Sequence, residues 1–177
     1  DFCLSRGLGD VYKRQAQETV RRVQAMAEQR GITVQVENTD DPYVIGDPTL
    51  LEQAVLVLLD NAIKYNRQGG HVTVRTAIQE EKALLEVLDT GIGIASEYLP
   101  HLGERFYRVD KARSREAGGT GLGLSIAHGI VVAHEGTLNL SSVPEQGTTV
   151  TLTLPLAQGD FIDDIPGSVS SLPENTL

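Results

Sequence analysis

The sequence predicts an α/β fold, a two-layer sandwich with a mixed, mostly antiparallel sheet, helices on one face and a long lid. Several short segments alternate apolar and polar residues, as half-buried strands do. Longer segments repeat apolar residues every three or four positions, as helices packed along one side do. The order of elements is helix, strands, helix, hairpin, long loop, helix and hairpin, which a sheet with helices on one face accommodates.

The first elements follow from local periodicity. Residues 1–15 show no clear period, and we expect an unstructured or foreign segment there. A helix is predicted over 16–30 and ends at Gly31, because glycine readily leaves the helical conformation. Alternation then predicts a strand over 32–37 and a second, short strand over 43–45.

The central elements have clearer boundaries. Asp47-Pro48 predicts the start of a helix, with Asp as the cap and Pro at the first helical position. This helix runs to about residue 65, and a turn follows over 67–70. Alternating residues in 72–78 and 83–87, joined by two glutamates, predict a hairpin.

The last third of the domain begins with a long loop over 90–121, with one helical turn near 96–99. A loop of this length inside a compact domain is usually a lid or a binding element. A largely buried helix is predicted over 122–134, and strands over 136–142 and 148–154 complete the sheet.

Composition limits the class of protein. The chain has 177 residues, and the folded domain is expected to occupy residues 16–156, followed by a disordered acidic tail over 157–177. No apolar run approaches the roughly 18 residues that span a bilayer. A single cysteine, Cys3, excludes an internal disulfide framework and a zinc site built of cysteines. A formal charge of −9 argues against a nucleic-acid partner.

Three polar residues, Asn61, Lys64 and Tyr65, lie at the end of the helix that is predicted to begin at Asp47-Pro48. Asn61 is flanked by apolar residues, so its amide lies at the edge of the core and needs a partner. An amide oxygen suits Mg²⁺, which binds few protein groups together with phosphates, and Lys64 beside Tyr65 adds positive charge. The alternative is a helix-ending Asn followed by a solvated Lys.

Asp89 ends a predicted strand and is followed by Thr-Gly-Ile-Gly. Glycines let the backbone approach a ligand closely. A carboxylate there can accept a hydrogen bond from the exocyclic amine of adenine, whereas guanine presents a carbonyl, so this position would select ATP over GTP. A plain Asp-x-Gly turn is the alternative.

Positive charge is concentrated in the long loop, between Glu104 and Glu116. Clustered cations in an acidic protein suit a polyphosphate. Interleaved acidic residues leave an exposed loop of mixed charge as the alternative. The basic residues are Arg105, Arg108, Lys111, Arg113 and Arg115.

The segment Gly118-Gly-Thr-Gly-Leu-Gly123 opens the last predicted helix. Free backbone N–H groups and the helix dipole make such a helix start an anion site. No Gly-Lys-[Ser/Thr] follows, which excludes a Walker A loop, and the glycine spacing disfavours a dinucleotide fold or an ordinary protein kinase. The four histidines have no metal-binding spacing, and we assign them structural or surface roles.

Together these segments resemble the catalytic ATP-binding domain of bacterial two-component sensor histidine kinases, within the ATPase superfamily shared with gyrase and the MutL repair proteins. The resemblance covers roughly residues 27–156. Segment 47–65 is similar to the N box and 89–94 to the G1 box. Segment 104–108 is similar to the F box and 119–124 to the G2 box.

The resemblance implies how the phosphates and metal of ATP would be held. Asn61 would ligate Mg²⁺, and Lys64 and Tyr65 would contact the phosphates. Arg105 or Arg108, with Arg108 favoured, would reach the γ-phosphate, so that Asn61, Lys64 and Arg108 form the catalytic set. The residues expected to hold the phosphate chain at the lid and helix start are Thr120, Gly121, Leu122, Gly123 and Leu124.

The resemblance also implies a base site and exposes two departures. Asp89 would bind the adenine amine, with Gly91 and Gly93 shaping that wall. Val57 occupies the usual position of the first N-box Asn, so this turn offers neither a base nor a ligand; this fits poor hydrolysis and weaker metal binding. Gly103 stands where the F box usually begins with Phe, which removes an apolar anchor of the lid.

The family's phosphoacceptor histidine is not found before the N box. The implied function is therefore transfer of the γ-phosphate of Mg-ATP to a histidine on a separate dimerisation domain, with a response regulator downstream. We expect a monomeric fragment of a homodimeric sensor, on the cytoplasmic side of a membrane-anchored protein. The alternatives are an anti-sigma-type serine kinase on the same fold and a degenerate nucleotide-sensing module.

Overall fold

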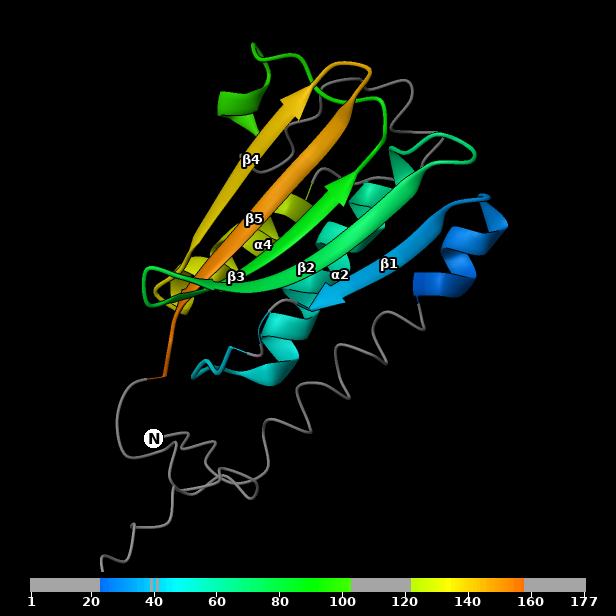
Figure 1. Ribbon diagram of the computed structural model, residues 1–177. Coiled ribbons are helices and arrows are strands. Elements are labelled where there is room, and N and C mark those ends of the chain that lie inside the picture. The colour runs from blue at the N-terminus through cyan, green and yellow to red at the C-terminus, as the bar shows by residue number, and fades with distance from the viewer. Residues whose placement is uncertain (1–22, 39, 41, 103–121, 158–177) are drawn as a thin grey trace, which may run out of the picture.

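The computed structural model describes residues 23–38, 40, 42–102 and 122–157, which form one five-stranded sheet with helices on one face (Figure 1). The strands are β1 (Thr33–Asn38), β2 (His71–Gln79), β3 (Lys82–Asp89), β4 (Thr137–Val143) and β5 (Gly147–Pro155). Their order in the sheet is β1-β2-β3-β5-β4. Only the β1–β2 pairing is parallel among these strands, so the predicted sandwich with a mixed, mostly antiparallel sheet is confirmed.

A helical segment over 23–29 precedes β1 and confirms the described part of the helix predicted over 16–30. Val23 and Ala27 of this segment are buried in the core. The helix ends at Gly31, whose φ of 65° is a conformation that glycine adopts without the strain of a side chain. The predicted segment 1–15 lies outside the described residues.

Helix α2 (Pro48–Lys64) connects the parallel strands β1 and β2 by crossing one face of the sheet. Its start is as predicted: the Asp47 carboxylate accepts hydrogen bonds from the backbone N–H groups of Thr49 and Leu50 at 2.9 and 3.1 Å. One side of the helix is buried against the sheet, through Leu51, Ala54, Leu58, Leu59, Ala62 and Ile63.

The short strand predicted over 43–45 is wrong. Residues 42–45 form no strand, although Val44 packs against the core while Tyr43 and Ile45 are exposed. The backbone of this segment forms no ladder of hydrogen bonds with a neighbouring strand of the described sheet. It makes an isolated one, in which the Ala157 N–H donates to the Tyr43 carbonyl at 2.9 Å. The alternation therefore reflected one partly buried side chain in a connecting segment.

The hairpin of β2 and β3 is confirmed, and it turns through Glu80 and Glu81. Both residues have positive φ, 49° and 58°, as a two-residue turn that matches the strand twist requires. The register places Asp89 opposite Val72 on one side and opposite Thr148 of β5 on the other. Asp89 therefore ends an inner strand of the sheet.

Beyond β3, a turn at 96–98 leads into a 3₁₀ helix, Leu99–His101, so the helical turn predicted near 96–99 lies slightly further along the chain. Helix α4 (Gly123–Ala133) confirms the helix predicted over 122–134. It lies beside α2 on the same face of the sheet (Figure 1). Within the described ranges, no helix has the length and apolar character needed to cross a membrane.

His134 joins the two helices at the end of α4. Its Nε2 accepts a hydrogen bond from the Asp47 N–H at 3.0 Å, and its Nδ1 lies 2.7 Å from the Ile130 carbonyl. This arrangement requires a neutral ring with its hydrogen on Nδ1, since Nε2 is the acceptor. His134 thus has a structural role, linking the cap of α2 to the end of α4.

Candidate nucleotide-binding site

Asp89 is the centre of the candidate site. Its Oδ1 accepts hydrogen bonds from the backbone N–H groups of Gly91 at 2.8 Å and Thr148 at 3.2 Å. Within the described part of the chain, its Oδ2 has no hydrogen-bond partner. Burial raises the pKa of the Asp89 carboxyl above its ordinary value, although the two backbone donors oppose this rise. A half-buried carboxylate with one oxygen free is suited to accept a hydrogen bond from a ligand.

The loop that follows Asp89 requires two of its glycines. A Cβ on Gly91 would collide with the Tyr65 carbonyl and with Asp89 Oδ1. Gly93 has a φ of 65°, and a Cβ there would collide with the Val143 carbonyl. These glycines therefore let the loop pack between the end of α2 and the β4–β5 hairpin, which fixes the wall beside Asp89.

The same loop is attached to the end of α2, where the Ile92 N–H donates to the Tyr65 carbonyl at 3.1 Å. Asn61 lies one turn earlier on this helix, half-buried, and its side-chain amide has no hydrogen-bond partner among the residues that the structure describes. Val57, a further turn back, packs where α4 begins, 3.1 Å from the position of a Cβ on Gly123. Asn61 follows Val57 by four residues and so shares its face of the helix.

Lys64 has a partner of its own in this structure. Its ammonium forms an ion pair with Asp60, one turn earlier, at 2.5 Å. A phosphate group would have to compete with this carboxylate for Lys64, so the predicted phosphate contact stays a prediction. Tyr65 caps the helix and is partly exposed, with 36% of its surface accessible.

The start of α4 is the position at which the sequence predicts an anion site, and that role stays a prediction. Among the described residues no side chain caps it: Leu122 occupies the cap position without a side-chain hydrogen bond, and Gly123 and Leu124 open the helix. Backbone N–H groups at such a start remain available for an anion. The other predicted phosphate-binding residues, Arg105, Arg108, Thr120 and Gly121, and the departure at Gly103, lie outside the described residues.

The structure adds residues that sequence analysis missed. Thr148 lies directly opposite Asp89 and donates its N–H to that carboxylate. Ser142 of β4 lies opposite Thr148, and its hydroxyl accepts a hydrogen bond from the Ile94 N–H in the loop after Asp89. No local pattern marked these two, because only the pairing order of the strands brings them to Asp89.

A metal ion at this site would find few protein groups to bind it. In the described ranges, no cluster of three or more His, Cys, Asp and Glu residues is placed to hold a metal ion. Mg²⁺ commonly keeps several waters and binds through one or two protein oxygens plus substrate phosphates. The unpartnered Asn61 amide fits that mode of binding.

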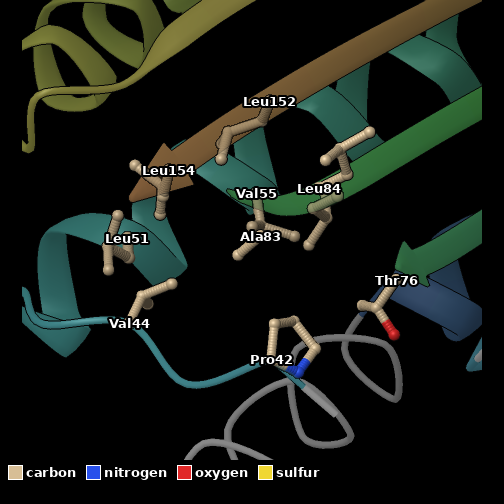
Figure 2. A pocket seen from close by; sticks show the side chains of 10 residues that line it. Pro42, Val44, Leu51, Val55, Thr76, Ala83, Leu84, Leu152 and Leu154 are labelled. Carbon is tan, nitrogen blue, oxygen red and sulfur yellow. The ribbon is translucent and has the colours of Figure 1, made fainter. Parts of the chain in front are cut away.

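A small apolar cavity of about 40 Å³ lies between α2 and the sheet (Figure 2). It is distant from the candidate site, because Ala83 and Leu154 in its wall lie at the ends of β3 and β5 opposite to Asp89 and Thr148. An apolar cavity of this kind excludes polar ligands. Its lining residues are Pro42, Val44, Leu51, Val55, Thr76, Ala83, Leu84, Leu85, Leu152 and Leu154.

Comparison with known proteins agrees with this geometry. Residues 46–158 match the family described as histidine kinase-, DNA gyrase B-, and HSP90-like ATPase. The sensor histidine kinase WalK of Bacillus subtilis is 47% identical over 117 residues, which are 65% of this chain and 19% of WalK. The sensor-like histidine kinase SenX3 of Mycobacterium tuberculosis is 39% identical over 147 residues, 83% of this chain and 36% of SenX3.

A solved structure of the mycobacterial sensor histidine kinase MprB has the same fold, with a TM-score of 0.65 and 34% identity. The match covers 80% of this chain and 94% of that one. The chain thus spans only 19% of the length of WalK and 36% of the length of SenX3. It therefore corresponds to one part of such proteins.

Proposed function

Because the chain belongs to the family of histidine kinase-, DNA gyrase B- and HSP90-like ATPases, we propose that it is the ATP-binding catalytic domain of a sensor histidine kinase. The observation that carries the proposal is Asp89. Its Oδ1 is held by two backbone N–H groups, while Oδ2 has no partner among the described residues and is left for the amine of adenine. The domain occupies residues 16–156.

The remaining groups hold the phosphates. Asn61 is the protein ligand of Mg²⁺, which supplies positive charge that offsets the charge of the β- and γ-phosphates. The uncapped start of α4 at Leu122–Leu124 receives the phosphate chain. Lys64 and Tyr65 add contacts from the end of α2. Arg108 or Arg105 reaches the γ-phosphate from the lid.

The reaction is transfer of the γ-phosphoryl group to a histidine on a separate dimerisation domain. The imidazole nitrogen forms a bond to the γ-phosphorus, the bond from that phosphorus to the bridging oxygen breaks, and ADP leaves. The domain contributes chiefly positioning and charge stabilisation. Val57 packs against the start of α4 and offers no base to activate water, so hydrolysis is slow. A response regulator then receives the phosphoryl group.

A calorimetric titration of the full chain with ATP tests this proposal. We expect saturable binding of ATP in the presence of Mg²⁺ and markedly weaker binding with EDTA, because the phosphates are held partly through the metal. ITP, which carries a carbonyl in place of the adenine amine, should bind more weakly than ATP. Absence of ATP binding with Mg²⁺ present would contradict the proposed function.

A further inference from the structure

Ser142 connects three parts of the wall beside Asp89. Its hydroxyl lies 2.8 Å from the Ile94 backbone nitrogen, 2.9 Å from the Gly147 carbonyl and 2.8 Å from the Thr148 hydroxyl. The strand register places Ser142 opposite Thr148, and Thr148 opposite Asp89. Thr148 therefore lies between Ser142 and Asp89, the carboxylate proposed to bind the base.

These three contacts determine the direction of each hydrogen bond. A serine hydroxyl has one hydrogen to donate and two lone pairs to accept. The Ile94 N–H can only donate, and the Gly147 carbonyl can only accept, so the Ser142 hydrogen goes to Gly147. The remaining contact must then run from the Thr148 hydroxyl to Ser142. The hydroxyl hydrogen of Thr148 is therefore already used in the hydrogen bond to Ser142.

A Thr148 hydroxyl without a free hydrogen offers only lone pairs to any other group. An ionised Asp89 also offers only lone pairs, and the backbone N–H of Thr148 is bound to its Oδ1. These two side chains therefore accept hydrogen bonds from a bound base and donate none to it. Such a wall favours a base with an exocyclic amine and disfavours a carbonyl at the same position.

We infer that Ser142 is a positioning residue for base selectivity, because it keeps the Thr148 hydroxyl an acceptor. The inference rests on the proposed binding of ATP at Asp89. Without the Ser142 hydroxyl, the Thr148 hydrogen can turn toward the bound base and donate to a carbonyl. The loop stays attached by other bonds: Ile92 donates to the Tyr65 carbonyl at 3.1 Å and accepts from the Glu145 N–H at 2.8 Å.

The test compares the affinities of the full chain for ATP and for ITP, each with Mg²⁺. Ser142→Ala should lower the preference for ATP by about tenfold, mainly through tighter binding of ITP. Ser142→Thr restores a hydroxyl and should restore the preference. Ser141→Ala is the matched control, since Ser141 is the exposed neighbour on the same strand and should leave both affinities unchanged.

A second variant separates selectivity from stability. Thr148→Val removes the hydroxyl that would otherwise turn its hydrogen from Ser142 to the base, but it keeps the backbone N–H that binds Asp89. Adding Ser142→Ala to Thr148→Val should not change the ATP to ITP ratio further, because the hydrogen at issue is gone. If Ser142→Ala weakens both nucleotides equally, Ser142 only supports the fold and the inference is overturned.

The outcome for the unmodified chain distinguishes two failures. If it binds neither nucleotide, the proposed function fails and the inference fails with it. If it binds ATP in preference to ITP while Ser142→Ala keeps that preference, the inference alone fails. Equal affinity of the unmodified chain for the two nucleotides also overturns the inference, because there is then no selectivity for Ser142 to maintain.

Discussion

Asn61→Ala is expected to abolish Mg²⁺-dependent binding of ATP while the domain stays folded. The Asn61 amide is half-buried and has no hydrogen-bond partner among the described residues, so its removal breaks no hydrogen bond within that part of the fold. Alanine is also the best helix former, which favours α2. Loss of the protein ligand to the metal should lower the affinity by on the order of 100-fold or more.

Titration of the variant with ATP, with Mg²⁺ and with EDTA, measures this effect. Gln53→Ala is a suitable control, because Gln53 is exposed on the same helix two turns before the site. It should bind ATP as the unmodified chain does. A metal-dependent affinity that survives in Asn61→Ala would remove this residue from the site.

Asp89→Asn is expected to reverse the preference for the base. Two backbone N–H groups point at Oδ1, and only the carbonyl oxygen of asparagine can accept them. The amide nitrogen must then take the place of Oδ2, where it faces the adenine amine as a second donor. ATP should bind more weakly and ITP more tightly, a change in discrimination of roughly 1–3 kcal/mol. An unchanged ATP to ITP ratio would show that Asp89 does not read the base.

The thermal stability of the Asp89→Asn variant is measured as a control. The direction of its change follows from the raised pKa of the Asp89 carboxyl. A carboxyl whose pKa is higher in the folded state stabilises the fold below its unfolded pKa and loses that contribution as the pH rises through its folded pKa. The neutral amide escapes this loss. Asp89→Asn should therefore raise the melting temperature of the nucleotide-free chain at neutral pH. The gain should vanish below the ordinary aspartate pKa of about 3.9.

Local signals predicted the elements well. Asp47-Pro48 gave the start of α2, and alternation gave the β2–β3 hairpin, because capping and side-chain period act between near neighbours. The error at 43–45 arose from the same rule, since one partly buried Val44 between two exposed residues imitates the alternation of a strand. The Asp60–Lys64 pair is spaced by four on a helix and could have been predicted.

The residues that sequence analysis missed are brought to Asp89 by the order of the strands in the sheet. Periodicity says which face of a strand is buried, but not which strand lies beside it. β5 lies between β3 and β4, and this brings Thr148 to Asp89 and Ser142 to Thr148. The contact between Val57 and Gly123 likewise depends on how α2 and α4 pack. Asp89 lies at the end of β3, as the local pattern predicted, whereas the residues that hydrogen-bond around it could be identified only from the tertiary structure.

Phosphotransfer from γ-labelled ATP tests the central claim most directly. The full chain is incubated with Mg²⁺ and labelled ATP, alone and with a dimerisation domain from a sensor histidine kinase that carries the acceptor histidine. We predict no label on this chain and label on the partner that survives alkali and is lost in acid, as phosphohistidine requires. Label on this chain itself, or alkali-sensitive label on a serine, would contradict the account.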